Sequence, residues 1–427
     1  MSHAAPLRPD KTRPDTVVPV AMEGKGRMRN RSRRVGRARR VGQVAALAGG
    51  VLVLAGCGTR QSIFEPRGDA ATRINNLQVP VFIVAGVVGV IVFAAVGYVA
   101  FRFRDRPGRT IPSQTHGKKV VELTLTGLSA AILIAIVLPT VSTILSLART
   151  PKDALVVRVT GQQWWWEYTY QDVNGASGRP LVTSGEMVIP VKTKIQLEIT
   201  SRDVIHSFWI PALNGKKDAV PGRVSPLWIE ADKPGQYFGQ CTEFCGLSHA
   251  NMREKVIALN KADFDAWVAN QSKPVNKPAD AESAAGKGYA SVAARCAACH
   301  QVDGLTDDAG AQINAKSDEQ LVSGVAPNLT HLMTRSTFAG ANFSLRTKEC
   351  QDRLDKATPD EFGTEYLKGT SVECLDRPAL EEWLRNAPGM KAMAPDPGPN
   401  GLRRGMPNLG LTEAQIDELI AYLSTLS

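Results

Sequence analysis

The sequence predicts a multi-domain membrane protein: a hairpin of two transmembrane helices, then a β-sandwich domain, then an all-α domain. Three observations support this order. Two long apolar runs lie before residue 150, a region of β-type alternation follows them, and helical patterns surround a cysteine pair in the last third of the chain. A length of 427 residues is sufficient for several domains.

The N-terminal segment, residues 1–56, is predicted to be a lipoprotein-type signal peptide. A basic stretch runs through Arg40 and is followed by a short apolar run. The segment ends Leu-Ala-Gly before Cys57, which resembles a bacterial lipoprotein cleavage box with Cys57 as the lipidated residue. An uncleaved anchor with a chance cysteine is the alternative. Because the basic stretch is long, translation could also start at Met22 or Met28.

The basic excess of the chain is concentrated at this N-terminus. Its first 50 residues hold 12 Lys or Arg against 3 Asp or Glu, which accounts for nearly all of the formal charge of +10. The remainder of the chain is close to neutral. This distribution argues against nucleic-acid binding, which requires basic side chains on the folded domains.

Two apolar runs predict membrane-spanning helices over residues 79–101 and 122–148, after an outer N-terminal segment, 57–78. Each is longer than the roughly 20 residues that cross a bilayer. The loop between them, residues 102–121, contains six Lys or Arg and one acidic residue, Asp105. The positive-inside rule places this loop in the cytoplasm, so both flanks and the rest of the chain lie on the outer face.

Residues 152–270 are predicted to form an antiparallel β-sandwich. The runs 155–159, 187–191 and 195–199 alternate or cluster apolar residues between turn-forming residues. Residues 271–285 lack periodicity and are predicted to be a linker.

The segment Cys-Thr-Glu-Phe-Cys-Gly-Leu-Ser-His-Ala-Asn-Met at residues 241–252 concentrates metal-binding side chains. Thiolate and thioether ligands select copper, and imidazole accepts it readily. His206, in a strand-like run upstream, could supply a second imidazole. Zinc is an alternative, although this spacing is unusual for a closed tetrahedral site. A disulfide between Cys241 and Cys245 is the other alternative.

This segment resembles the dinuclear copper (CuA) site of subunit II of haem-copper cytochrome c oxidases. The resemblance implies a cupredoxin fold for residues 152–270 and assigns ligands by position. The implied assignments are Cys241 and Cys245 as bridging thiolates, His206 and Met252 on one copper, and His249 with the backbone carbonyl of Glu243 on the other. It further implies that the Glu243 carboxylate faces a magnesium or manganese ion shared with the catalytic subunit.

The sequence Cys296-Ala-Ala-Cys299-His300 is the attachment pattern for c-type haem. Alone, it could also be a redox disulfide or half of a zinc site. Its surroundings resemble a class I cytochrome c, which implies an all-α cytochrome c domain over residues 286–427. In that family the cysteines form thioethers, the histidine is the proximal ligand, and a proline carbonyl, here that of Pro327, orients its ring.

The second axial haem ligand is predicted to be Met406. A Met-Pro pair stands just before the predicted final helix, Thr412 to Leu426, where these cytochromes place their sixth ligand. Methionine and histidine ligation raises the reduction potential. Met390 and Met393 are the competing candidates, but neither has the following proline at the family's spacing.

Two further residues have roles implied by the resemblance. Trp164 is the first tryptophan of the run Trp164-Trp165-Trp166 and maps to the electron-accepting residue beside the copper site, whereas the other two are expected in the core. Glu122 maps to a glutamate at the mouth of a proton-uptake channel, although this chain lacks the tryptophan that commonly follows it.

Cys350 and Cys374 remain after these assignments, and in an oxidising compartment a disulfide between them is expected. An active dithiol is the alternative. The two cysteines lie in a polar stretch, residues 342–377, that is inserted relative to a minimal cytochrome c.

Together the motifs resemble subunit II of a caa-type cytochrome c oxidase, an oxidoreductase of the respiratory chain. The resemblance implies an electron relay from the fused haem c through CuA to a catalytic subunit that reduces oxygen to water and translocates protons. The implied partners are subunits I and III, an upstream cytochrome or cytochrome bc complex, and the lipids of the bacterial plasma membrane. Two alternatives are the electron-input subunit of a nitric oxide reductase and an exported copper-binding or copper-delivery lipoprotein. The linker at 271–285 would make the haem domain a tethered carrier at high effective concentration.

Overall fold

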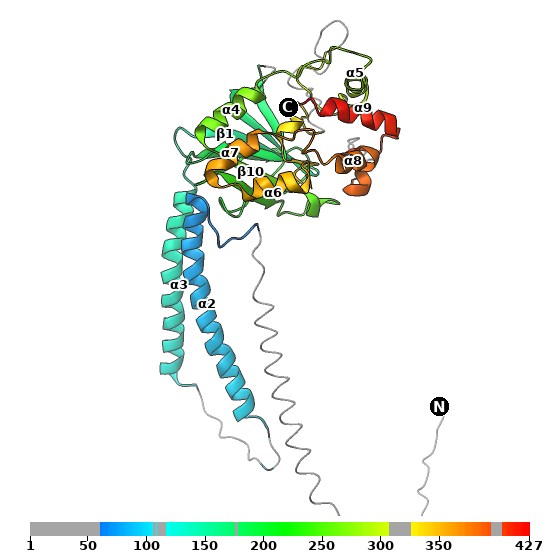
Figure 1. Cartoon of the computed structure of the whole chain (residues 1–427). Coiled ribbons are helices and arrows are strands. Elements are labelled where there is room, and N and C mark those ends of the chain that lie inside the picture. The colour runs from blue at the N-terminus through cyan, green and yellow to red at the C-terminus, as the bar shows by residue number, and fades with distance from the viewer. Residues whose placement is uncertain (1–59, 106–107, 109–116, 176–177, 307–325, 394–403) are drawn as a thin grey trace, which may run out of the picture. The chain divides into compact units, whose positions relative to one another are not determined.

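A computed structural model describes residues 60–105, 108, 117–175, 178–306, 326–393 and 404–427. The predicted signal peptide and Cys57 lie outside these residues. The described chain begins with two long helices, continues into a β-rich domain and ends in a mainly helical region (Figure 1).

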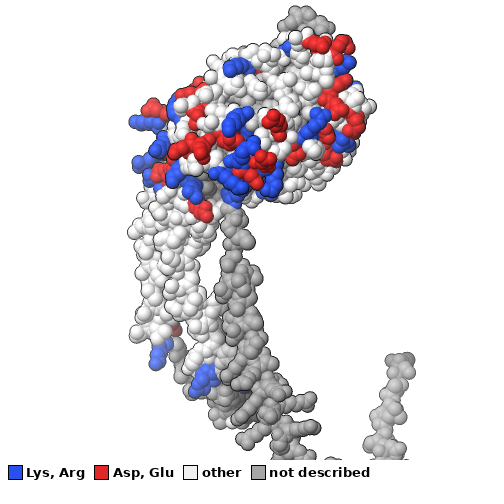
Figure 2. Space-filling view, in the orientation of Figure 1, with Lys and Arg blue, Asp and Glu red and all other residues white. Residues whose placement is uncertain are grey.

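The two long helices are α2 (Asp69–Arg102) and α3 (Lys119–Leu147), and both are long and apolar enough to cross a membrane. Their visible surface carries almost no charge, whereas side chains of both signs are mixed over the globular part (Figure 2). Helix α2 begins at Asp69, before the predicted span starts at residue 79. The reason is that its first turn packs on the β-rich domain, where Ala70 is buried and the Ala71 N–H donates to the Leu213 carbonyl at 3.2 Å.

The β-rich domain contains a five-stranded sheet, in the order β3-β2-β1-β5-β8, and a three-stranded sheet, β4-β10-β9. The strands are β1 (Leu155–Gln162), β2 (Trp165–Asn174), β3 (Pro180–Ser184), β4 (Glu186–Pro190), β5 (Ile195–Ser201), β8 (Ser225–Ile229), β9 (Gly235–Gln240) and β10 (Arg253–Leu259). The prediction of a purely antiparallel sandwich is wrong, because β1 pairs with β5 and β10 pairs with β4 in parallel. Parallel neighbours require a long crossover, and β2, β3 and β4 supply it between β1 and β5.

Apolar side chains from both sheets fill the domain. On β2, Trp166, Tyr168 and Tyr170 are fully buried, and Val157 and Val159 on β1 join the same cluster. Their period of two places them on one face of the sheet. Trp166 is therefore buried in this core, as the sequence predicts, whereas Trp165 points to the opposite face and is buried outside this cluster.

A short ladder of β6 (His206–Phe208) and β7 (Lys217–Ala219) lies beside the sandwich. It carries His206 at its first residue. The side chains of all three β6 residues are buried, so the position of this histidine is fixed by the fold.

The C-terminal region is mainly helical, as the sequence predicts, and its assignment as an all-α cytochrome c domain stays a prediction. Its elements are α5 (Ala284–Ser291), the π-helical turn η2 (Val292–Cys296), β11 (Thr337–Phe338), β12 (Phe343–Ser344), α6 (Lys348–Lys356), α7 (Pro359–Leu367), α8 (Arg377–Met390) and α9 (Glu413–Leu423). The strands β11 and β12 form a two-residue antiparallel ladder. Helix α9 starts at a capping box formed by Thr412 and Gln415, and it packs on α5 through the ring pair Tyr289–Tyr422.

The predicted linker runs from the end of α4 (Lys261–Gln271) to the start of α5. Part of it contacts the C-terminal region. The Val275 side chain is buried and its N–H donates to the Asp303 carbonyl at 3.1 Å, while the Lys273 carbonyl lies 2.9 Å from Nε2 of His331.

Candidate metal centre and the adjoining cavity

The predicted copper ligands converge at one end of the β-sandwich. The ligand atoms of His206, Cys241 and Cys245 all lie within 4.8 Å of one another, and all three residues are buried. The two sulfur atoms are 3.8 Å apart, and Nδ1 of His206 lies 4.0 Å from Sγ of Cys241. The structure thus brings the histidine of β6 to the loop that follows β9.

The rest of the predicted ligand set lies around the same two sulfur atoms. Nδ1 of His249 is 3.5 Å and Sδ of Met252 is 3.8 Å from Sγ of Cys245. The Glu243 carbonyl oxygen is 3.2 Å from Sγ of Cys241. Two thiols, two imidazoles, a thioether and a carbonyl are a donor set that suits copper, so these residues fit a dinuclear copper group.

Two local features shape this loop. The Cys241 N–H donates to the Met252 carbonyl at 3.0 Å, which closes the loop at its base. Gly246 adopts φ +108°, a conformation that side-chain-bearing residues rarely adopt, and it allows the chain to turn between Cys245 and His249.

The electrostatics of the two thiols favour metal binding. A hydrogen bond from Cys245 lowers the pKa of Cys241. Burial raises this pKa, but a further hydrogen bond with His206 also lowers it, and the pKa falls to about 3. The same shared bond and burial raise the pKa of Cys245. A thiol whose pKa is lowered gives up its proton readily, and the resulting thiolate is the form that binds a soft cation.

His206 is oriented by a carboxylate on its far side. Its Nε2 lies 2.8 Å from Oδ1 of Asp203, so Nδ1 faces the sulfur atoms. Burial lowers the pKa of His206, but the hydrogen bonds of Asp203 and Cys241 outweigh it and leave the pKa raised. A carboxylate behind a ligating histidine is a common outer-shell arrangement that fixes the ring.

Trp164 lies between β1 and β2 and is 4% exposed. Its indole N–H donates to the Cys245 carbonyl at 3.0 Å. The neighbouring Gln163 side chain donates to the same carbonyl at 2.7 Å. The residue predicted to accept electrons is therefore bonded directly to the backbone of a predicted copper ligand.

A cavity of about 330 Å³ is lined by Trp164 and by the predicted haem residues. Cys296, Cys299 and His300 contribute to one part of its wall. Nδ1 of His300 is 2.7 Å from the Pro327 carbonyl, the contact that the family resemblance implies. Burial lowers the pKa of His300, so its ring is held neutral, as a metal ligand requires.

Two of the three candidate methionines reach this cavity. Met406 and Met393 both line it, and the Met406 N–H donates to Sδ of Met393 at 3.0 Å. Met390 is not among the described residues that line the cavity. The chemistry of the wall, with a cysteine pair, a buried imidazole and thioethers, fits a covalently attached haem.

Part of the cavity wall comes from the β-sandwich domain, and no sequence motif indicates this contribution. Gln163, Trp164, Trp165 and Ser184 line the cavity together with the haem-motif residues. Another residue without such a motif is Lys391, whose buried Nζ donates to the carbonyls of Trp164 at 2.7 Å and Ala339 at 3.0 Å. Burial lowers the pKa of Lys391 to about 7. No local motif marks a lysine that is buried by a distant segment.

The remaining predicted residues lie elsewhere. The Glu243 side chain is exposed at the surface of the copper-binding loop. Glu122 is exposed in the first turn of α3 and takes no part in the metal centre. Cys350 and Cys374 form a disulfide with an S–S distance of 2.00 Å, away from the two sites.

Known proteins resemble both the β-sandwich domain and most of the full chain. Residues 155–259 match the family model described as "Cytochrome C oxidase subunit II, periplasmic domain". The chain is 33% identical over 286 residues to cytochrome c oxidase subunit 2 of Alkalihalophilus pseudofirmus, covering 65% of this chain and 82% of the relative. It is 31% identical over 396 residues to cytochrome c oxidase subunit 2 of Bacillus sp. (strain PS3), covering 88% of this chain and 94% of the relative.

Among solved structures, the periplasmic domain of subunit II of the cytochrome oxidase of Bradyrhizobium japonicum is 36% identical. It aligns with 29% of this chain and 96% of its own length, at a TM-score of 0.27.

Fold, site and relatives define a class of protein: a membrane-anchored oxidoreductase subunit with a cupredoxin-like domain on the outer face. Within that class, the chain belongs to the cytochrome c oxidase subunit 2 family. It therefore functions as subunit II of a cytochrome c oxidase and associates with other subunits of that complex. The family domain implies a CuA copper centre.

Proposed function

We propose that this chain relays electrons within a cytochrome c oxidase, receiving them at a haem c in its own C-terminal domain and passing them through CuA to the catalytic subunit. The observation that carries the proposal is the position of Trp164. It lies between the two sites, with its indole bonded to the Cys245 carbonyl and its ring in the wall of the cavity. When bound, the copper pair and the haem would each accept and donate single electrons.

The residues proposed to hold copper are His206, Cys241, Cys245, His249, Met252 and the carbonyl of Glu243. Asp203 orients His206, and the surrounding sandwich keeps water from the sulfur atoms, because Cys241, Cys245 and Met252 are at most 4% exposed. A buried and rigid site limits the change in geometry and solvation that an electron transfer would otherwise require.

The residues proposed to hold haem c are Cys296 and Cys299 as thioether attachments, His300 as the proximal ligand and Met406 as the distal ligand. The Pro327 carbonyl fixes the orientation of the His300 ring. Lys391 fixes the backbone of Trp164 against the cavity, since it donates to the Trp164 carbonyl from the haem-binding side.

The surface around the copper-binding loop is proposed to face subunit I. Apolar side chains that would ordinarily be buried are exposed there: Val204 at 37%, Ile205 at 45%, Val224 at 53%, Phe244 at 77% and Leu247 at 64%. Glu243 is exposed on the same loop and could face a magnesium or manganese ion at that interface. Large exposed apolar groups on a folded domain commonly mark a protein interface.

The wider assembly follows from this assignment. Subunits I and III of the oxidase are the proposed partners in the plasma membrane, with α2 and α3 as a multi-pass anchor. A cytochrome or a cytochrome bc complex is the proposed donor to the haem. Glu122, in the first turn of α3, is proposed to lie at the mouth of a proton-uptake channel shared with subunit I.

The experiment that tests this function is metal and haem analysis of the purified complex together with its visible and paramagnetic resonance spectra. The proposal expects two coppers and one covalent haem per copy of this chain, with a mixed-valence copper signal. One zinc per chain, or one copper with an ordinary blue-copper spectrum, would contradict the copper assignment. Haem that is extracted without breaking a covalent bond would contradict the haem assignment.

A further inference from the structure

The inserted segment, residues 342–377, packs against the copper-binding domain, residues 152–270. Helix α7 contributes Phe362 and Tyr366, and α6 contributes Leu354, to the same buried apolar cluster as the core of the β-sandwich. These three side chains are at most 2% exposed. In Figure 1, α7 lies against the β-rich domain with α6 next to it, and contacts of α7 with α4, β9 and α6 agree with that view. The segment therefore shares a core with the copper-binding domain, to which it is not adjacent in sequence.

A buried carboxylate joins the two domains. Glu186, on β4, is 1% exposed and accepts hydrogen bonds from the Ser336 hydroxyl at 2.7 Å, the Thr337 hydroxyl at 2.6 Å and the Tyr366 hydroxyl at 3.0 Å. All three donors belong to the haem-binding domain, residues 286–427. On the adjacent β10, Lys255 donates to the Ser336 hydroxyl at 2.6 Å. A buried carboxylate without such donors would be strongly destabilising, so Glu186 depends on the haem-binding domain.

The backbones of the two domains also approach closely. A Cβ atom at Gly185 would lie 3.0 Å from the Ala341 nitrogen, and one at Gly340 would lie 3.0 Å from Cβ of Trp165. Both glycines have positive φ, +76° and +72°. The turn that joins β3 to β4 therefore meets the turn that joins β11 to β12 with little room for side chains.

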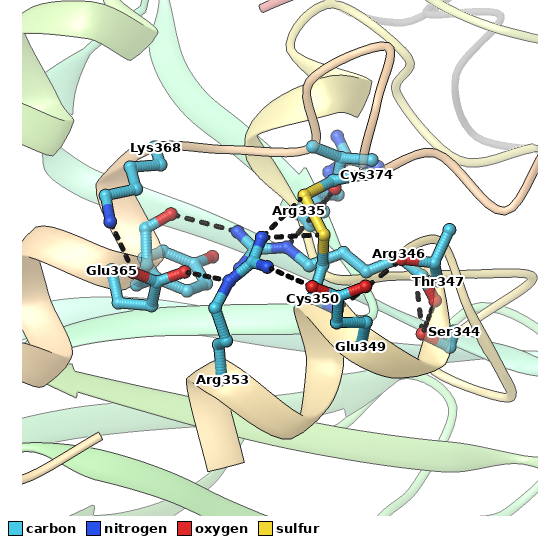
Figure 3. Close-up of a disulfide and its surroundings, with 12 residues drawn as sticks. Arg335, Ser344, Arg346, Thr347, Glu349, Cys350, Arg353, Glu365, Lys368 and Cys374 are labelled. Carbon is cyan, nitrogen blue, oxygen red and sulfur yellow. Dashed lines mark hydrogen bonds and ion pairs between the residues drawn. A yellow bond between two sulfur atoms is a disulfide. The ribbon is translucent and has the colours of Figure 1, made fainter. Parts of the chain in front are cut away.

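The inserted segment is itself braced, as Figure 3 shows around the disulfide. The Cys350–Cys374 bond ties α6 to the chain that leads into α8. Arg353 lies 3.1 Å from Glu349 and 3.7 Å from Glu365, and so connects α6 to α7. The Arg346 guanidinium donates to the Tyr366 carbonyl at 3.1 Å. These contacts hold Tyr366 in the position from which it reaches Glu186.

We propose that the inserted segment is an interdomain clamp that keeps the haem-binding domain docked on the copper-binding domain, with the cavity held against Trp164. The electron would then pass within one fixed arrangement, and the segment 271–285 would not act as the flexible tether that the sequence analysis expects. Because Trp164 is covered, an external donor would have to approach the haem-binding domain. The inference that the electron passes within one fixed arrangement rests on the proposed function, whereas the inference that the two domains are docked does not.

The docking is tested on the full chain in the purified complex, with a protease site introduced within residues 271–285. After cleavage, gel filtration at high dilution and mass analysis report whether the C-terminal fragment stays bound. The proposal expects the cleaved wild-type chain to retain the fragment. Prompt loss of the fragment from the cleaved wild-type chain would overturn the proposal.

Variants then test the clamp itself. Tyr366→Phe and Glu186→Gln should each increase the rate of fragment loss on the order of 10- to 100-fold, the range for a buried hydrogen bond to a charged group. Tyr366→Phe should have a smaller effect in the Glu186→Gln background than in the wild-type chain, since the two residues are coupled through one charge-assisted hydrogen bond. Tyr422→Phe is the matched control, because its buried hydroxyl has no hydrogen-bond partner among the described residues and lies on α9. Equal loss rates in Tyr366→Phe and Tyr422→Phe would overturn the role of the clamp.

Fragment retention is measured by mass and requires neither copper nor haem. Failure of the cofactor assignment would therefore leave this result unchanged. Conversely, complete loss of docking would leave the metal and haem content of the intact chain as proposed. The two proposals can thus fail separately.

Discussion

The proposed copper centre and the proposed haem cavity are built in different ways. Five of the six residues proposed to bind copper lie on one loop, and their donor atoms converge within a single domain. The cavity instead takes its cysteine pair, its methionines and its tryptophan wall from segments far apart in the chain and from two domains. A compact local site is specified by its own sequence, whereas the second site depends on how the domains dock.

The largest expected effect is on the local site. Cys241→Ser should abolish copper binding, because it removes a sulfur that both copper ions would share and leaves the buried loop without its low-pKa thiol. Copper content per chain and the paramagnetic resonance spectrum of the purified complex measure the loss. Haem content should not change, since no cysteine of the pair at 296 and 299 is altered. Retention of near-normal copper by this variant would contradict the assigned site.

Met406→Ala should have the next largest effect, at the haem. Loss of the thioether should lower the haem potential, because methionine and histidine ligation raises it. The absorption band of the sulfur–iron bond should disappear as well. Met393→Ala and Met390→Ala should keep the band, and Met390→Ala is the cleaner control because Sδ of Met393 accepts a hydrogen bond from the Met406 N–H. Since Met393 also lines the cavity, a band that survives in Met406→Ala but is lost in Met393→Ala would transfer the ligand role to Met393.

The two sites also differ in how much of each could be predicted from the sequence. The proposed copper ligands could be found from the sequence because five of them lie within twelve residues, with only His206 outside that run, and the structure brings their donor atoms close together. The cavity residues Ser184 and Lys391 were not predictable, because burial by a distant segment leaves no local pattern. The same reason explains the parallel pairing of β1 with β5, since alternation predicts strands but not their partners.

A smaller effect concerns pH and the docking of the two domains. Burial raises the pKa of Glu186, but Lys255 and the hydroxyls of Thr337 and Ser336 outweigh it and leave the pKa lowered. The charged groups that also face it, Arg335 and Arg346, are cations in the acid range. A lowered pKa means that the contribution to docking is fully present above the ordinary value of 4.5 and is lost as the pH falls through the lowered value.

Retention of the cleaved C-terminal fragment should therefore weaken below about pH 4.5, and measurement of retention across the acid range gives the curve. Glu186→Gln should weaken docking at neutral pH and flatten this acid limb. If retention falls just as much at acid pH in Glu186→Gln as in the wild-type chain, another group is responsible for the pH dependence.

The smallest expected effect is a change in the copper reduction potential caused by a substitution in the haem-binding domain. Nη1 of Arg404, two residues before Met406, lies 3.0 Å from Oδ2 of Asp203, whose other oxygen holds His206. Arg404→Met should make that carboxylate a stronger acceptor, stabilise the oxidised copper pair and lower its potential. Redox titration of the copper signal measures the change. Arg385→Met is the control, since Arg385 pairs with Glu413 at an exposed site in the haem-binding domain. Equal potentials in the two variants would mean that the haem-binding domain does not influence the copper ligands.

The central claim is that haem c and CuA exchange electrons within one docked chain. Rapid-mixing reduction of the purified complex, followed at the haem and copper absorption bands, tests it most directly. We expect the haem to be reduced first and copper to follow at a rate that is independent of dilution and ionic strength, both before and after cleavage within residues 271–285. Screening by salt acts over about 10 Å at 0.1 M and affects encounters between separate partners. Copper that is reduced before the haem, or at a rate that falls on dilution of the cleaved complex, would contradict the account.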